Sequence, residues 1–359
     1  MKIGIFTFHF VHNYGAVLQA FGLQEHLKSM GHEVYIVDYR PRYLCDTYKM
    51  FSLNRIPSGS LLCRLKFLLR EVLTIPVRFY RYIRFNRFIK DHLLLDDFDG
   101  SGQDYQCFIF GSDQIWNPMI TNGIDDVFVG NFSGAHRAKL VAYAASVGSL
   151  QNLSTMDSNK LMHYTNRFEM LSCREIELTN FLKLNLSKDV FTVLDPVLMA
   201  GKEPFQKLLP AKSKKKKPYL LLFSLSANEL LREFSYNLAV TKGLIVIEVL
   251  SDQISLLSFK VKHSLPVPYF LDYINNAEVV VTSSFHGTAL SILFEKEFYF
   301  SQTDKPSSER VLNLLRILGL EDRVVYKPTE MNTKTINYAA VNNILEKERI
   351  LSRIFLSSI

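Results

Sequence analysis

Short apolar runs and longer amphipathic segments alternate along the chain, and their order predicts a parallel β-sheet. Residues 2–8 form a compact apolar run, which is typical of a buried strand. Residues 14–30 carry apolar positions at helical spacing and end at Gly31, and residues 33–39 are again strand-like. A strand, a helix and a second strand in succession form a βαβ unit, so we expect an α/β fold from the first residues.

The strand pattern recurs in two groups separated by a proline- and lysine-rich stretch. The further strands are expected at residues 106–110, 139–144, 168–172 and 191–194, and then at 219–225, 244–250 and 278–282. Residues 195–218 contain several prolines and the run Lys212 to Lys217, which is typical of a domain boundary. We therefore expect two α/β domains, residues 1–200 and 201–359, with a last helix near 338–356 that packs back on the N-terminal domain.

Residues 64–90 differ from the rest because basic and aromatic residues are interleaved there. Pro76 interrupts the segment, so the pattern predicts two helices, each with a basic face and an aromatic face. Such a segment suits contact with an anionic membrane surface. It also suits a solvated basic face over ordinary packing. The sequence leaves both interpretations open.

The composition is that of a globular protein, with 48% hydrophobic and 21% charged residues and a net charge of +7. The four cysteines lack the spacing of a metal site, so we expect free thiols in a reducing cytoplasm. No recognised nucleic-acid motif accompanies the basic stretches, and we expect no nucleic-acid partner.

The polar loop after the expected strand 278–282 is the strongest candidate site. It contains Ser283, Ser284, His286, Gly287 and Thr288 and opens a helix. A helix N-terminus favours anions, and a histidine there can donate a hydrogen bond to phosphate or transfer a proton. The alternative is a buried capping histidine.

Three strands of the N-terminal half are also followed by candidate residues: His12, Asn13, Tyr14 and Gly15 after the first, then Asp113, then Arg174. The first group suits a polar ligand or a plain helix cap. Asp113 is a candidate catalytic carboxylate or a cap. Arg174 suits a phosphate or carboxylate, or an ion pair with Glu175, Glu177 or Asp195. Because such loops share one edge of a parallel sheet, we expect these groups to meet between the domains.

Six motifs, in this order, resemble the polysaccharide pyruvyltransferase family. They are Asn13-Tyr14-Gly15-Ala16-Val17-Leu18-Gln19-Ala20, Gly111-Ser112-Asp113-Gln114-Ile115-Trp116-Asn117, Tyr143-Ala144-Ala145-Ser146, Ser172-Cys173-Arg174-Glu175, Leu194-Asp195-Pro196-Val197 and Ser283-Ser284-Phe285-His286-Gly287-Thr288-Ala289. The resemblance implies two Rossmann-like domains facing each other across a cleft, as in GT-B glycosyltransferases. It also implies transfer of a pyruvyl group from phosphoenolpyruvate to a sugar, with formation of a cyclic ketal.

The resemblance implies roles for particular residues and a setting for the reaction. Arg174 and His286 match the family residues associated with phosphoenolpyruvate, and no metal or organic cofactor is expected. From the chemistry of ketal formation, His286 is the candidate acid, and Asp113 or His12, from the facing domain, the candidate base. The loop lacks the acidic residue that some relatives carry after Gly15, so the identity of the base stays open. The acceptor is expected to be an oligosaccharide or lipid-linked sugar of capsule or exopolysaccharide biosynthesis, at the inner face of the plasma membrane.

Two other functions remain open from the sequence. One is a GT-B-type glycosyltransferase that uses a nucleotide sugar bound near residues 283–288. The other is a non-catalytic protein that binds a phosphorylated metabolite. Stabilisation by phosphoenolpyruvate or by nucleotide sugars distinguishes the first from the expected transferase.

Overall fold

The computed structural model describes residues 1–48, 60–100, 104–211, 217–226, 228–250, 261–263, 265–301, 309–329 and 334–359. Most of the lysine run from Lys212 to Lys217 lies outside these residues; Lys217 alone lies within them.

The N-terminal half forms a seven-stranded parallel sheet with the strand order β3-β2-β1-β4-β5-β6-β7. The strands are β1 (Lys2–Phe6), β2 (Glu33–Asp38), β3 (Leu95–Asp97), β4 (Cys107–Phe110), β5 (Lys139–Ala145), β6 (Met170–Cys173) and β7 (Val190–Thr192). The chain changes direction across the sheet between β1 and β4, and ligands of open α/β sheets bind at such a point. The loops after β1 and β4 carry the candidate residues His12, Asn13 and Asp113.

The C-terminal half repeats this design with five parallel strands in the order β10-β9-β8-β11-β12. The strands are β8 (Tyr219–Ser224), β9 (Ile245–Leu250), β10 (Val261–His263), β11 (Val279–Thr282) and β12 (Glu297–Phe300). Here the change of direction lies between β8 and β11, and the loop after β11 leads to His286. The expected α/β fold class is confirmed, with a Rossmann-like parallel sheet in each half of the chain.

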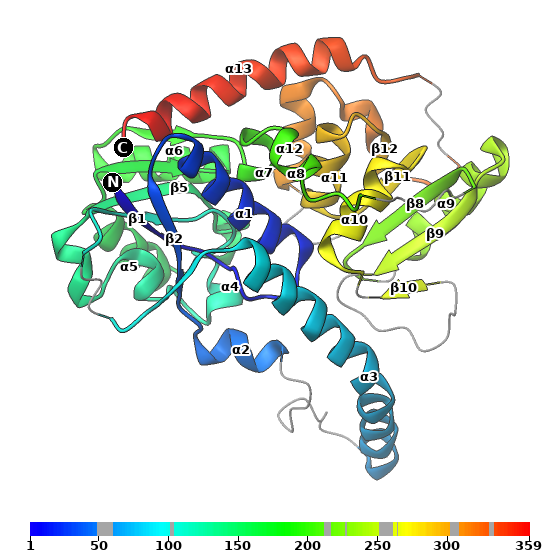
Figure 1. Cartoon of the computed structure of the whole chain (residues 1–359), viewed down its shortest axis with the longest axis horizontal. Helices are drawn as coiled ribbons and strands as arrows, with labels where there is room; N and C mark the ends of the chain where they lie inside the picture. Colours follow the sequence, from blue (N-terminus) through cyan, green and yellow to red (C-terminus); the bar gives the residue numbers. More distant parts are fainter. Residues whose placement is uncertain are drawn as a thin grey trace.

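Helices cover both sheets (Figure 1). They are α1 (Tyr14–Ser29), α2 (Arg42–Tyr48), α3 (Leu61–His92), α4 (Pro118–Thr121), α5 (Thr155–Thr165), α6 (Ile176–Leu186), α7 (Pro196–Met199), α8 (Glu203–Gln206), α9 (Glu229–Lys242), α10 (Val267–Asn275), α11 (Phe285–Leu293), α12 (Glu309–Leu318) and α13 (Tyr338–Ser357). Short 3₁₀ turns lie between several of them.

One hydrophobic core is shared by the two halves. Its buried side chains come from β1, α1, β8, α10, α11 and α13, so apolar contacts continue from one sheet to the other. Two further clusters lie on the outer sides, one for each sheet. The shared core holds the loops after β1 and β11 in fixed positions relative to each other.

α13 links the two halves at the end of the chain. The ring of Phe355 lies 6.1 Å from that of Tyr143 on β5 and 5.7 Å from that of Phe191 on β7. The hydroxyl of Ser352 accepts a hydrogen bond from the backbone N–H of Leu194 at 2.9 Å. A boundary near residue 200, which we propose, lies between the last strand of the first sheet and the first strand of the second.

The prediction of two helices separated at Pro76 is wrong, because α3 is one helix that continues through this proline. Proline removes one backbone hydrogen bond and crowds the preceding turn, but a helix can continue through it when the remaining backbone hydrogen bonds form. Among the helices that the structure describes, none is long and apolar enough to cross a membrane.

Candidate functional site

The site is built where the first turns of α1 and α11 meet. Asn13 caps α1 by accepting hydrogen bonds from the backbone N–H groups of Gly15 and Ala16, at 2.9 and 3.4 Å. Ser284 caps α11 by accepting from the N–H of Gly287 at 3.3 Å. Short polar side chains commonly cap helix N-termini in this way. They fix the two helix ends on which His286 and Gly15 lie.

Gly15 and His286 touch across the interface between the halves. A Cβ atom at position 15 would lie 2.0 Å from Nδ1 of His286, so only glycine allows this approach. Next to it, Tyr14 stacks on Phe270 with ring centroids 3.9 Å apart and donates a hydrogen bond to the carbonyl of Leu265 at 2.9 Å. Tyr14 therefore contacts the C-terminal half through both its ring and its hydroxyl.

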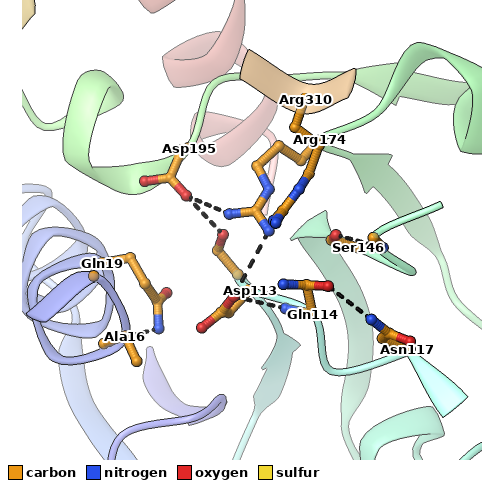
Figure 2. A network of polar contacts seen from close by, with 12 residues as sticks. Ala16, Gln19, Asp113, Gln114, Asn117, Ser146, Arg174, Asp195 and Arg310 are labelled. Carbon is orange, nitrogen blue, oxygen red and sulfur yellow. Dashed lines mark hydrogen bonds and ion pairs between the residues drawn. The ribbon is translucent and has the colours of Figure 1, made fainter. Parts of the chain in front are cut away.

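Asp195 lies at the centre of a buried polar network (Figure 2). One of its oxygens, Oδ2, accepts a hydrogen bond from Nη1 of Arg174 at 2.8 Å. The same oxygen is 3.5 Å from Nε2 of His286 and 3.5 Å from the hydroxyl of Ser112. The other oxygen caps α7 by accepting from the N–H of Val197 at 2.9 Å. Asp195 thus joins the two candidate ligands of phosphoenolpyruvate.

The charge state of Asp195 follows from these neighbours. Burial alone raises the pKa of a carboxyl group, but His286, Arg174 and the N–H of Val197 outweigh it and lower the pKa of Asp195 below its ordinary value. The carboxylate is therefore ionised at neutral pH and holds Arg174 and His286 in place. Sequence alone proposed Asp195 only as one of three partners for Arg174.

Arg310, at the start of α12, brings a second guanidinium group to Arg174. Cζ of Arg174 lies 5.0 Å and Cζ of Arg310 lies 5.6 Å from the ring centroid of Phe285. Both side chains are buried, and burial together with the charge of Arg174 lowers the pKa of Arg310 to about 10. Figure 2 shows the two side chains next to each other above Asp113.

Several donors of this arginine pair lack hydrogen-bond acceptors within the described residues. They are Nε and Nη2 of Arg174 and Nε of Arg310. Nη2 of Arg174 lies 3.7 Å from Oδ1 of Asp113, and Nε of Arg310 lies 3.9 Å from Oε1 of Glu175, both beyond hydrogen-bonding distance. Buried donors of this kind are costly unless a ligand completes them, so the pair is arranged to receive an anion.

Asp113 and Glu175 border the arginine pair. Oδ1 of Asp113 accepts a hydrogen bond from the N–H of Gln114 at 2.8 Å, and its side chain is 13% exposed. Glu175 accepts a hydrogen bond from the hydroxyl of Ser146. The third sequence candidate for an ion pair with Arg174, Glu177, instead accepts from Asn313 at 3.1 Å.

His12 lies apart from this network. Its ring packs against Tyr82 and Phe85 of α3, with centroids 5.6 Å away in each case, and its carbonyl accepts hydrogen bonds from Arg81. Burial, with Arg81 and Arg40 nearby, lowers the pKa of His12 to about 4. The side chain is therefore neutral at neutral pH.

The other predicted residues of the 283–288 loop mainly shape α11. Thr288 donates to the carbonyl of Ser284 at 3.1 Å, and Ser283 is half-buried. A Cβ at Gly287 would lie 2.3 Å from the hydroxyl of Thr282, so this glycine allows close helix–strand packing.

Sequence analysis did not propose Arg310, because this residue lies in none of the six motifs and does not directly follow an expected strand. An arginine on the buried face of an amphipathic helix was the only available signal. No group of His, Cys, Asp and Glu suited to a metal ion is present among the described residues. The arrangement offers two guanidinium groups for an anion, an imidazole for proton transfer and a carboxylate, Asp113, beside them.

Comparison with known proteins identifies one family. The model of the family described as polysaccharide pyruvyl transferase matches residues 13–303. This range contains Arg174, Asp195 and His286, and Arg310 lies outside it. A search of curated proteins finds no match.

Solved structures with some likeness to this chain include three sugar enzymes. A mutant O-GlcNAc transferase from Thermobaculum terrenum is 11% identical, with a TM-score of 0.43, and the comparison covers 100% of this chain and 63% of that protein. A UDP-GlcNAc 2-epimerase from Methanocaldococcus jannaschii is 12% identical, with a TM-score of 0.45 and coverage of 96% and 92%. The E. coli heptosyltransferase WaaC with ADP-2-deoxy-2-fluoro heptose is 10% identical, with a TM-score of 0.40 and coverage of 97% and 99%. Likeness at this level carries no conclusion about function.

Proposed function

Because the chain belongs to the polysaccharide pyruvyl transferase family, we propose that it transfers a pyruvyl group from phosphoenolpyruvate to a sugar acceptor. The observation that carries this proposal is the buried pair of Arg174 and Arg310 beside His286. Phosphoenolpyruvate is a compact anion with a phosphate and a carboxylate, and two forked guanidinium groups match two such oxygen clusters.

The proposed chemistry uses the groups around this pair. His286 donates a proton to the methylene carbon of phosphoenolpyruvate, which leaves an electron-deficient C2. One acceptor hydroxyl attacks C2, and a second hydroxyl attacks as the C2–O bond to phosphate breaks, so the products are a cyclic ketal and inorganic phosphate. Asp113 takes the proton of the first hydroxyl, and the proton of the second hydroxyl leaves with the phosphate as hydrogen phosphate. Arg174 and Arg310 stabilise the leaving phosphate. Asp195 orients His286 and Arg174.

Asp113 is a stronger candidate base than His12. The Asp113 carboxylate lies 3.7 Å from Arg174, whereas the ring of His12 packs between aromatic side chains of α3. A base must come within hydrogen-bonding reach of the reacting hydroxyl. We propose that Ser283 and the helix-capping residues Asn13 and Ser284 border the substrate site.

We further propose that the acceptor is a lipid-linked sugar of a surface polysaccharide, such as a capsule or exopolysaccharide. The reaction then takes place in the cytoplasm, at the inner face of the plasma membrane. The basic and aromatic character of residues 64–90 supports this location.

Phosphate release from phosphoenolpyruvate tests the proposal. The protein is incubated with phosphoenolpyruvate and galactosyl, mannosyl or hexosamine acceptors, and the product is examined for the mass of a ketal-linked pyruvyl group. Phosphate release that requires an acceptor supports the proposal. Thermal stabilisation by a nucleotide sugar, with none from phosphoenolpyruvate, contradicts it and indicates a glycosyltransferase. Binding of phosphoenolpyruvate without turnover on any acceptor indicates a binding protein.

A further inference from the structure

The helix α3 exposes a continuous line of apolar side chains. They recur three, four or seven residues apart and are each between 44% and 61% exposed: Leu65, Leu69, Val72, Leu73, Tyr80 and Ile83. On an α-helix this spacing gathers side chains on one side. We call these six residues the apolar stripe.

The opposite side of α3 faces the protein. Glu71 and Thr74 are 4% and 1% exposed, and Arg78 forms an ion pair with Glu71. Further along, Arg81 donates hydrogen bonds to the carbonyl of His12. The apolar stripe therefore lies on the side of α3 opposite these buried residues. Figure 1 shows the N-terminal half of α3 projecting away from both sheets.

A stripe of this length needs an apolar partner. Single exposed apolar residues are ordinary, but a contiguous exposed patch marks a binding surface. Within the described residues, other strongly exposed apolar side chains, such as Leu184 on α6 and Val240 on α9, occur away from α3. α13 carries a shorter exposed set, Ile350, Leu351 and Ile354, so among the described residues the stripe on α3 is distinguished by its length.

The charge around the stripe indicates the chemistry of the partner. Residues 64–90 contain eight lysines and arginines and a single acidic residue, Glu71. At the end of the stripe nearest the domains, Arg84, Arg87 and Asp91 line a cavity of about 510 Å³ together with Ile83 and Tyr269. Apolar side chains flanked by positive charge match the acyl chains and phosphates of an anionic lipid surface.

We propose that α3 lies along the surface of an anionic phospholipid membrane, with the apolar stripe inserted at the level of the headgroups. This inference extends the proposed lipid-linked acceptor, since it holds the transferase next to such an acceptor. Binding to vesicles does not require turnover, so the two proposals fail separately. Arg87 lies 3.4 Å from Asp91, but both side chains are largely exposed, so the basic residues of α3 still outnumber the acidic ones beside the stripe.

The experiment is co-sedimentation of the full chain with vesicles of phosphatidylcholine containing about 30 mol% phosphatidylglycerol. The test variant is Leu69→Glu with Val72→Glu, because both side chains are exposed and their replacement leaves the packed face of α3 intact. The matched control is Leu184→Glu with Val240→Glu, which adds the same charge on exposed positions of other helices.

We expect the wild-type protein and the control to bind these vesicles and the stripe variant to bind at least about tenfold more weakly. Binding to pure phosphatidylcholine should also be at least about tenfold weaker. Equal binding by the stripe variant, or no binding by the wild type, overturns the proposal. So does a wild-type dimer in solution that the stripe variant converts to a monomer without any effect on vesicle binding, since the stripe then covers a second copy.

Discussion

Gly15 on α1 and His286 on α11 lie in van der Waals contact, although they belong to different halves of the protein and are far apart in the sequence. A Cβ at position 15 would overlap the imidazole, with Nδ1 at 2.0 Å, Cγ at 2.3 Å and Cε1 at 2.6 Å. The N-terminal turn of α1 therefore sets the position of the proposed catalytic acid, which itself belongs to α11. The contact joins the two halves of the protein next to the proposed catalytic acid.

Gly15→Ala should lower turnover while the fold is retained. Alanine favours a helix over glycine by about 1 kcal/mol, which offsets part of the cost of the clash. The displaced imidazole can no longer reach its proposed position, so we expect kcat to fall about 10- to 100-fold. Steady-state kinetics of phosphate release measures this change.

A double-mutant cycle tests whether Gly15 acts through His286. If it does, Gly15→Ala should change little in a His286→Asn background, because the displaced side chain is already inactive. Additive losses in the double variant would show that Gly15 acts on another part of the site.

Arg310→Gln should raise the KM for phosphoenolpyruvate about 10- to 100-fold, the range expected for loss of a charged hydrogen bond. The free protein should be no less stable, because the pKa of Arg310 is already lowered by burial and by Arg174. The combination of weaker binding with unchanged melting temperature separates a ligand role from a structural one. Arg316→Gln, on an exposed part of the same helix, is the control and should leave KM unchanged.

Asp195→Asn should destabilise the protein by about 3–5 kcal/mol, the usual result of removing one partner of a buried ion pair. Asp113→Asn should lower the free energy of unfolding by much less, because this side chain is partly exposed and lies 3.7 Å from Arg174. Urea denaturation of both variants gives the comparison. A similar loss of unfolding free energy in the two variants would contradict the central role of Asp195.

The contribution of Asp195 should also depend on pH. Its pKa is lowered in the folded protein, so the stability it provides is present above the ordinary aspartate value of 3.8 and declines as the pH falls below it. The stability difference between the wild type and Asp195→Asn should therefore shrink in acid. A difference that stays constant down to the lowest pH at which the protein folds would indicate that the carboxylate is not paired.

His12 should lower the stability of the protein in mild acid. Its pKa falls from 6.5 to about 4 on folding, so the unfolded chain binds the proton more tightly. The wild type should lose up to about 3 kcal/mol between pH 6.5 and pH 4 relative to His12→Gln. Denaturation curves across this range measure the loss. If His12→Gln instead removes the acidic limb of the pH–rate profile, His12 is the general base.

The sequence alone determined the alternation of strands and helices in both halves. Short β-branched and apolar runs bounded by polar residues, such as that ending at Thr282, favour strands, and Gly31 directly follows the end of α1. Polar residues after these strands then had to lie at one edge of each sheet. Asp113, Arg174 and His286 were proposed as site residues in this way, by local pattern and by resemblance.

Only the tertiary structure decided which of these residues meet. The pairing of Arg174 with Asp195 in place of Glu177, the approach of Gly15 to His286 and the arrival of Arg310 from α12 all depend on how two sheets pack through a shared core. The same holds for α3, where packing of Glu71 and Thr74 against the protein leaves the apolar stripe outside. Periodicity predicts which residues share a face of a helix or strand, but it does not give the distances between elements. Those distances set the chemistry that this site can perform.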